Sequence, residues 1–272
     1  MRVEDLIIYG KKSLHSIEAK MLLSNLLGYD TLNLLNHLDE IVSEDIELKY
    51  KECINAIKRN KPLQYVIGNV NFYGNEFEIN ENVLIPRFET EELVEKTIEF
   101  ITTNFNDTNL NVIDLGCGSG VIGITLKKKI PSLSVTCLDI SEESLKVAKK
   151  NAEKLEVEIN FIKGDMLNNI NDKFDIIISN PPYIKDNEEI DEIVKNNEPH
   201  IALYAGIDGL YYYRQILSKV KEKLKDKFLI AFEIGMTQKE EITNIANQFL
   251  ENTKVECIKD LSNKDRILFI YN

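Results

Sequence analysis

The chain has 272 residues, of which 43% are hydrophobic and 29% are charged, and its formal net charge at pH 7 is -12. This length is comfortable for two domains, and the composition is that of an ordinary soluble globular protein. Proteins that bind duplex nucleic acid usually carry a basic footprint. Because this chain has no basic excess, nucleic acid is not expected as its direct substrate.

The cysteine and histidine pattern argues against a metal site. The four cysteines are Cys53, Cys117, Cys137 and Cys257. No two of them have a Cys-x-x-Cys spacing and the histidines lie far from them, so neither zinc nor a disulfide framework is predicted. The apolar run at 6–9 is too short for a signal peptide, and no stretch is long enough to span a bilayer. A reducing cytoplasm is therefore the expected location, without a membrane partner.

Residues 1–75 are predicted to form a helical domain. Apolar side chains recur at helical spacing at Ile17, Met21, Leu22 and Leu26. Gly28 is a plausible end for this helix, and a second helix is expected over 44–59, ended by Pro62. Small helical bundles often serve as recognition domains, so this region is predicted to recognise the substrate. A purely structural cap is the alternative.

A short linking region, 76–109, is expected next. Apolar and polar residues alternate over 70–79 with a turn signal at Gly74–Asn75, which predicts a β-hairpin that joins the two halves of the chain. A helix is expected over 89–103, followed by a loop over 104–109.

The pattern changes over 110–272, where short apolar segments alternate with helices. The strand candidates are 112–115, 134–138, 159–163, 176–179, 228–233, 254–258 and 267–271. Helical segments such as 142–154 and 209–223 separate most of them, which predicts an α/β sandwich with a mainly parallel sheet. The last two candidates have no helix between them, so a hairpin around 260–264 is expected to add an antiparallel strand.

A glycine-rich turn follows the first of these strands. Gly116, Gly118 and Gly120 stand between an apolar strand and the start of a helix. Glycine suits such a turn because a β-carbon would hinder the backbone angles and the close approach of a ligand. The pattern indicates a nucleotide site, with a plain structural loop as the alternative.

Acidic residues follow the next two strand candidates. Asp139 comes roughly 20 residues after the glycines, where Rossmann-type folds place an acid that accepts hydrogen bonds from ribose hydroxyls. Asp165 could accept from an adenine amino group, with Met166 against the ring. A helix-capping Asp139 and a turn aspartate beside a core methionine are the alternatives. These features fit NAD and S-adenosylmethionine equally.

The fourth strand candidate ends in Asn180-Pro-Pro-Tyr183, where open α/β sheets bind ligands. Pro181 and Pro182 lack a backbone N–H and fix the loop. The side-chain oxygen of Asn180 and the carbonyl of Pro181 are expected to accept the two N–H bonds of a planar substrate nitrogen, with Tyr183 stacked on it. Orienting such a weak nucleophile suits methyl transfer and favours S-adenosylmethionine. A rigid turn beside the core is the alternative.

Over nearly its whole length the chain resembles the HemK family of peptide chain release factor glutamine methyltransferases. The segments that carry the resemblance are Lys61–Tyr65, Leu84–Glu91, Asp114–Gly120, Asn180–Tyr183, Glu198–Pro199, Asp208–Leu210 and Asp265–Arg266. The resemblance implies a Rossmann-like class I S-adenosylmethionine methyltransferase sheet behind a helical N-terminal domain. It also implies that the substrate is the glutamine of the Gly-Gly-Gln loop of class I release factors, with S-adenosylhomocysteine as product.

The resemblance further implies which residues form the site. Those that contact S-adenosylmethionine would be Gly116, Cys117, Gly118, Ser119, Gly120, Asp139, Asp165, Met166 and Asn180. Those that hold the glutamine would be Asn180, Pro181, Pro182 and Tyr183. The family often has proline where this chain has Phe88, and an aromatic residue where it has Met166. Arg87, Glu89 and Glu91 are expected to clamp the domain junction, with a functional role as the alternative.

Three other functions fit parts of the pattern. A methyltransferase for a ribosomal-protein glutamine would use the same site. A methyltransferase for an exocyclic amino group of a DNA or RNA base would flip that base into it, but the negative charge argues against this. A binding module with a degenerate site is disfavoured because the glycines, Asp139 and Asn180–Tyr183 are intact.

Overall fold

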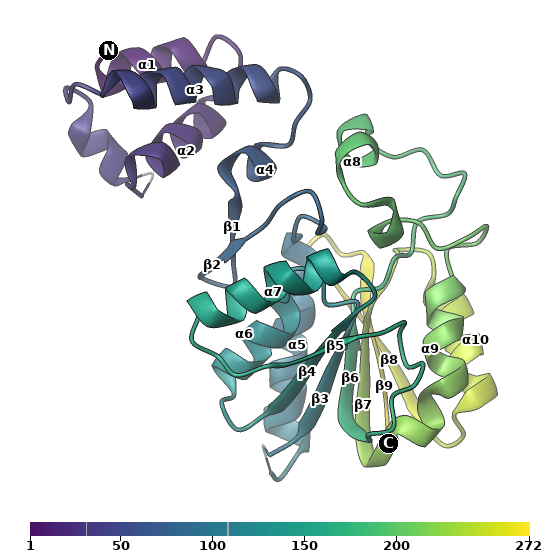
Figure 1. Ribbon diagram of the computed structural model, residues 1–272. Helices are drawn as coiled ribbons and strands as arrows, with labels where there is room; N and C mark the ends of the chain where they lie inside the picture. The colour runs from purple at the N-terminus through teal and green to yellow at the C-terminus, as the bar shows by residue number, and fades with distance from the viewer. Residues whose placement is uncertain (31, 108) are drawn as a thin grey trace. The chain divides into compact units, whose positions relative to one another are not determined.

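The computed structural model describes residues 1–30, 32–107 and 109–272. They form two compact units (Figure 1), one of 1–69 with 191–197 and one of 70–190 with 198–272. The first unit ends before the boundary expected after residue 75, and it includes the segment 191–197, which the sequence placed in the catalytic domain. None of the helices in the described part of the chain is long and apolar enough to cross a membrane.

The first unit is helical, as predicted. Its helices are α1 (Val3–Gly10), α2 (Ser16–Leu27), a 3₁₀ helix (Asn33–His37), α3 (Glu44–Ile57), α4 (Leu63–Ile67) and α8 (Glu192–Asn197). The backbone of Gly28 adopts a left-handed conformation and caps α2, while the Ser43 side chain accepts a hydrogen bond from the Ile46 N–H and starts α3.

The apolar face expected for α2 is only partly correct. Ile17 and Met21 are 70% and 40% exposed, whereas Leu22 and Leu23 are buried in the core of this unit. Tyr50 of α3 closes that core, and its hydroxyl donates to the carbonyl of Ala19 at 3.1 Å. Periodicity thus identified the helix but not which of two neighbouring apolar stripes it buries.

The hairpin forms with its turn one residue earlier than expected. β1 (Asn69–Phe72) and β2 (Asn75–Glu78) pair with each other. Tyr73 and Gly74 between them have φ angles of 50° and 76°, the geometry that a two-residue hairpin turn requires at both central positions. Gly74–Asn75 was the wrong pair because Asn75 already lies in β2.

The second unit is built on a seven-stranded sheet with the order β5-β4-β3-β6-β7-β9-β8. The strands are β3 (Asn111–Leu115), β4 (Ser134–Asp139), β5 (Asn160–Lys163), β6 (Phe174–Ser179), β7 (Leu224–Glu233), β8 (Lys254–Lys259) and β9 (Asp265–Tyr271). The first five run parallel, while β9 is antiparallel to both β7 and β8. The expected fold class is confirmed, including the antiparallel hairpin at the end of the chain.

Helices cover both faces of the sheet (Figure 1). They are α5 (Phe88–Asn104), α6 (Val121–Lys129), α7 (Glu142–Lys154), α9 (Tyr211–Val220) and α10 (Lys239–Phe249), with 3₁₀ helices at His200–Ala202 and Lys221–Lys223. Residue 108, inside the loop expected over 104–109, lies outside the described residues.

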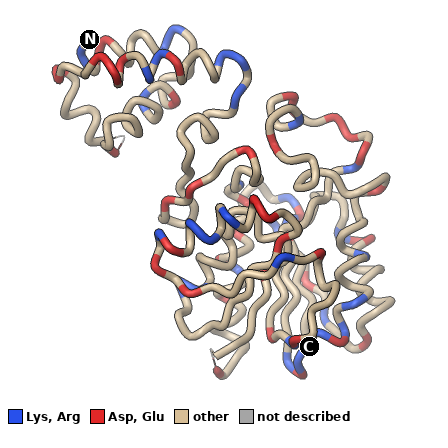
Figure 2. Tube along the Cα trace, in the orientation of Figure 1, with Lys and Arg blue, Asp and Glu red and all other residues tan. Residues whose placement is uncertain are grey.

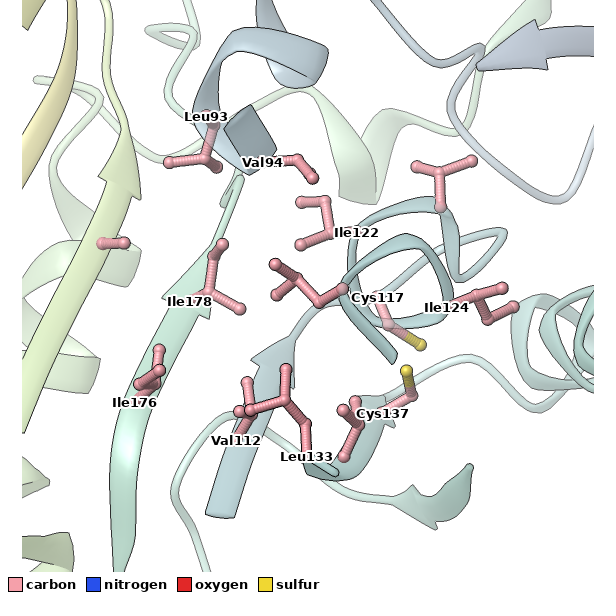
Figure 3. Packing of buried hydrophobic residues seen from close by; sticks show 14 of the residues in the cluster. Leu93, Val94, Val112, Cys117, Ile122, Ile124, Leu133, Cys137, Ile176 and Ile178 are labelled. Atoms are coloured by element: carbon pink, nitrogen blue, oxygen red, sulfur yellow. The ribbon is translucent and has the colours of Figure 1, made fainter. Parts of the chain in front are cut away.

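Alternate residues of the central strands enter two different cores, because successive side chains of a strand point to opposite faces. Val112 and Ile178 pack under α5 and α6 (Figure 3), whereas Ile113 and Ile177 pack under α9 and α10. Burial on both faces explains why these strands read as continuous apolar runs in the sequence. The chain proceeds from β3 to β4 and β5 on one side and returns to β6 on the other, so a switch point lies between β3 and β6.

Candidate active site

A cleft lies at the carboxyl ends of β3, β4, β5 and β6. It is partly open to solvent, and the empty space inside it, including some of that solvent, is about 720 Å³. Open α/β sheets bind ligands at this edge, beside the switch point. The predicted site residues that line the cleft are Gly116, Gly118, Asp139, Asp165, Met166, Asn180 and Pro182.

The glycine turn forms the floor of the cleft. The backbone N–H groups of Gly116 and Cys117 donate to the carbonyl of Leu138 at 2.8 and 3.0 Å, which fixes the turn to the end of β4. A β-carbon on Gly118 would meet no atom within 4 Å, and its φ is 56°. Gly118 therefore presents bare backbone to open space, where a ligand could approach the main chain closely.

Gly120 has a different role in the turn. A β-carbon on Gly120 would lie 2.8 Å from Cδ1 of Ile124, so the position is closed by packing at the start of α6. Gly120 does not line the cleft. The sequence grouped the three glycines together, but only Gly116 and Gly118 face the cavity.

Cys117 and Ser119 could contact the predicted cofactor only through their backbones. Both side chains are buried outside the cleft. The Cys117 sulfur points toward that of Cys137 (Figure 3), and a hydrogen bond between the thiols together with burial raises the pKa of Cys117. Since both side chains are buried away from the cleft, only their backbones remain available to a ligand.

Asp139 ends β4 on the wall of the cleft and is only 8% exposed. Its Oδ1 accepts from the Ser141 N–H and its Oδ2 from the Gly118 N–H, both at 2.8 Å. Burial raises the pKa of this carboxyl, and the backbone hydrogen bonds oppose the rise. The two oxygens together have more lone pairs than these backbone donors occupy, so the carboxylate could also accept from a ligand hydroxyl.

Asn180 lies in the cleft wall directly after β6. Its Nδ2 donates to Oγ1 of Thr90 on α5 at 3.1 Å. The loop that follows is held from the opposite side, where Nε2 of Gln238 donates to the Tyr183 carbonyl at 3.0 Å. Pro181 is buried and Tyr183 is half-buried, and neither lines the cleft. Burial raises the pKa of the Tyr183 hydroxyl.

An ion pair joins two segments whose neighbouring residues, Leu84 and Pro199, line the cleft. Arg87 and Glu198 pair at 2.5 Å, and the other oxygen of the buried Glu198 accepts from the Ile85 N–H at 3.1 Å. Both residues belong to the second unit, so Arg87 does not have to bridge two domains to find its partner. Glu91 accepts from the Tyr73 N–H at 3.0 Å and holds the hairpin turn to α5.

Several residues of the cleft were missed by the sequence. They are Asn82, Val83, Leu84, Leu138, Ile140, Ser141, Ser144, Gly164, Pro199, Ile201, Ala202 and Tyr212. The Ser144 hydroxyl donates to the Asn82 carbonyl at 2.9 Å and fixes the loop after β2 to α7. Ile140 could have been found from the sequence, because it directly follows the acidic residue that ends β4. Its side chain is 49% exposed. The others come from separate segments without a local motif.

The fold and this site define a class I S-adenosylmethionine-dependent methyltransferase. Residues 89–198 match the model of the Methyltransferase small domain family, and residues 11–68 match that of the PrmC N-terminal domain. A methyltransferase structure from Pyrococcus furiosus has a TM-score of 0.54 with 17% identity, covering 73% of this chain and 89% of that one. At this identity the structural similarity shows the fold alone.

Two curated relatives specify the family. The chain is 39% identical over 255 residues to the release factor glutamine methyltransferase of Bacillus cereus, covering 92% of this chain and 90% of the relative. It is 38% identical over 282 residues to that of Clostridium botulinum, covering 98% of each. The chain belongs to the family of release factor glutamine methyltransferases, and the resemblance inferred from its motifs is confirmed.

Proposed function

We propose that this chain transfers a methyl group from S-adenosylmethionine to the side-chain amide nitrogen of the glutamine in the Gly-Gly-Gln motif of class I peptide chain release factors. The observation that carries the proposal is that Asn180, an amide acceptor, lines the same cleft as Asp139 and the glycine turn. The methyl donor and the nitrogen that receives the methyl group would therefore meet in one cavity. S-Adenosylhomocysteine would be the other product.

The cleft residues fit the methyl donor. The donor supplies an electrophilic methyl group on a sulfonium. Asp139 would accept from the ribose hydroxyls, because its two oxygens have more lone pairs than their backbone donors occupy. Gly116 and Gly118 would allow the donor to approach the main chain, and Asp165 with Met166 would lie at the adenine end. Tyr212 adds a half-exposed ring to the same cavity.

The loop after β6 would hold the glutamine. An amide nitrogen is a weak nucleophile because its lone pair is delocalised into the carbonyl. The Asn180 Oδ1 and the Pro181 carbonyl would accept its two N–H bonds, orient it and stabilise the positive charge that develops on it. Pro182 would help to fix the loop, with the Tyr183 ring beside the amide. The nitrogen can release its proton after transfer, so no strong general base is required.

The N-terminal unit is proposed to recognise the release factor. It has its own buried core, formed by Val3, Leu6, Leu22, Leu34, Tyr50 and others. A folded protein partner also suits the electrostatics better than a nucleic acid. The net charge is -12, and Figure 2 shows acidic and basic residues interspersed along the chain. An acidic enzyme gains little from phosphate contacts, and free thiols at all four cysteines fit a reducing cytoplasm.

Incubation with labelled S-adenosylmethionine and a panel of acceptors tests the proposal. The panel contains a class I release factor, ribosomal proteins, ribosomal RNA and duplex DNA. We expect label in the release factor, and a peptide containing its Gly-Gly-Gln glutamine that is one methyl group heavier. Label in nucleic acid or a ribosomal protein, with none in the release factor, would overturn the proposed substrate.

We expect Asp139→Ala to weaken S-adenosylmethionine binding by roughly tenfold or more, because a hydrogen bond to a charged group contributes about 1.5–3 kcal/mol. Titration calorimetry measures the affinity. Asp139→Asn is the matched control, since it keeps the shape and one acceptor oxygen. Its affinity for S-adenosylmethionine should lie between that of the parent protein and that of the alanine variant. An unchanged affinity in the alanine variant would show that Asp139 does not hold the ribose.

A further inference from the structure

Two buried residues connect Asn180 to the interior of the second unit. Thr90 lies on α5 and is 3% exposed, and Glu233 ends β7 and is 1% exposed. The Asn180 Nδ2 donates to the Thr90 Oγ1 at 3.1 Å, and the Thr90 hydroxyl donates to Glu233 Oε2 at 2.7 Å. The three side chains come from separate elements and form one chain of hydrogen bonds that ends at the cleft.

The direction of this chain of hydrogen bonds is fixed by the single proton of the threonine hydroxyl. A carboxylate only accepts hydrogen bonds, so the Thr90 hydroxyl must donate its proton to the hydrogen bond with Glu233. Only lone pairs of Oγ1 then face Asn180. An asparagine side chain flipped by half a turn would place its oxygen against those lone pairs. The amide NH2 must therefore face Thr90, and the Asn180 Oδ1 is turned away from it.

Several groups maintain Glu233 as an acceptor. The Arg266 guanidinium attracts the carboxylate, and the Tyr183 hydroxyl also favours its charged form. Arg266 is itself held by Asp260, whose Oδ2 accepts from its Nε at 3.2 Å. The Tyr213 hydroxyl donates to the backbone carbonyl of Glu233 at 2.8 Å. A buried carboxylate with this many partners has a fixed position and can orient the groups bonded to it.

We propose that Thr90 and Glu233 are positioning residues that lock the Asn180 amide with its oxygen toward the substrate nitrogen. This inference rests on the proposed function, in which that oxygen accepts an N–H bond from the glutamine amide. Neither residue has to touch the substrate, since both act through Asn180. A pre-oriented acceptor does not have to reorganise during transfer, which is the condition for strong transition-state stabilisation.

The first test compares Thr90→Val with Thr90→Ser. Valine has the shape of threonine without the hydroxyl, whereas serine retains the hydroxyl. We expect valine to lower kcat for release factor methylation by about 10- to 100-fold, the effect of one hydrogen bond to a charged group, with a smaller change in KM. Serine should restore most of the rate. Equal rates for valine and the parent, or equal losses for valine and serine, would contradict the inference.

A measurement without any substrate separates this inference from the proposed function. The Asn180 side-chain NH2 group can be followed by NMR in protein labelled with 15N-asparagine and assigned with Asn180→Asp. Its protons should exchange slowly with water in the parent and in Thr90→Ser, and much faster in Thr90→Val. If exchange is as slow in the valine variant, the positioning role fails. If exchange behaves as expected but no release factor is methylated, the proposed function fails instead.

The pH dependence of kcat provides a further prediction. Burial raises the pKa of Glu233 to about 7 and the charge of Glu89 acts in the same direction, while the hydrogen bond from Thr90, the charge of Arg266 and the nearby Tyr183 hydroxyl lower it. Below that pH the protonated carboxyl can donate to Thr90, and the threonine proton becomes free to turn toward Asn180. We therefore expect kcat to rise as pH increases through about 7.

Glu233→Gln is the control for this profile. The glutamine side-chain oxygen can still accept a hydrogen bond from the Thr90 hydroxyl. Because glutamine does not titrate, the rise in kcat near neutral pH should flatten. Burial also raises the pKa of Asp114 to about 7. Asp114 lies next to the glycine turn, so its titration could change the affinity for S-adenosylmethionine. The profiles are therefore compared at saturating S-adenosylmethionine. A rise that persists unchanged in the glutamine variant would assign the titration to another group and contradict the role of Glu233.

Discussion

Replacement of Asn180 by alanine is expected to lower kcat for glutamine methylation by about 100- to 1,000-fold, the effect of removing one preorganised group that stabilises transition-state charge. The side chain lies in the cleft wall with its amide nitrogen bonded to Thr90. Alanine removes the oxygen that would orient the substrate nitrogen. Single-turnover kinetics with release factor, together with calorimetry for S-adenosylmethionine, would show a larger loss in rate than in affinity.

Asn180→Asp is the matched comparison. A carboxylate still accepts from the substrate amide but cannot donate to Thr90, so part of the activity should remain. It also introduces a second negative charge near the buried Glu233, which limits the recovery. An alanine variant that turns over near the parent rate would show that the proposed mechanism is wrong.

Deletion of residues 1–69 is expected to abolish methylation of intact release factor while S-adenosylmethionine binding survives. Linked binding modules increase avidity by about 10²–10⁴, so the loss should be about 100-fold or more. The cut is placed at the boundary between the two units, after the first residue of β1, because Phe72 and Phe77 of the hairpin belong to the core of the second unit. Removing residues through 75 would also remove Phe72 from that core, so a loss of activity could come from damage to the catalytic unit.

A short peptide containing Gly-Gly-Gln is the control for the deletion. It would contact the catalytic unit alone, so the full chain and the truncated chain should methylate it at similar, slow rates. The truncated chain has its own buried cores under both faces of the sheet, and calorimetry with S-adenosylmethionine checks that it folds. Methylation of release factor by the truncated chain at the full rate would show that the N-terminal unit is a structural cap.

The sequence alone was sufficient for the elements of the sheet. Each of the seven expected strand segments forms a strand, with ends that differ by a few residues. These signals are local, because a strand buried on both faces must be a short apolar run bounded by turn residues. The positions of the glycine turn and of Asp139 could also be predicted from neighbouring residues. The glycines directly follow one strand segment, and Asp139 ends the next.

Local patterns failed where two solutions fit equally well. Helix α2 was correctly predicted, but periodicity could not show that Leu23 would be buried in place of Ile17. A resemblance carries whole segments and does not resolve single side chains, so it could not show that the side chains of Cys117 and Ser119 are buried and leave only their backbones for the predicted cofactor. In each case the deciding contact comes from another element.

Only the tertiary structure decided how the cleft is held together. Glu198 reaches Arg87 from 111 residues away, and Asn180 and Glu233 reach Thr90 from 90 and 143 residues away. A buried polar group must find a hydrogen-bond partner, but the sequence around it does not indicate which one. The order of the strands brings the ends of β6 and β7 beside α5, and this long-range packing selects the partners.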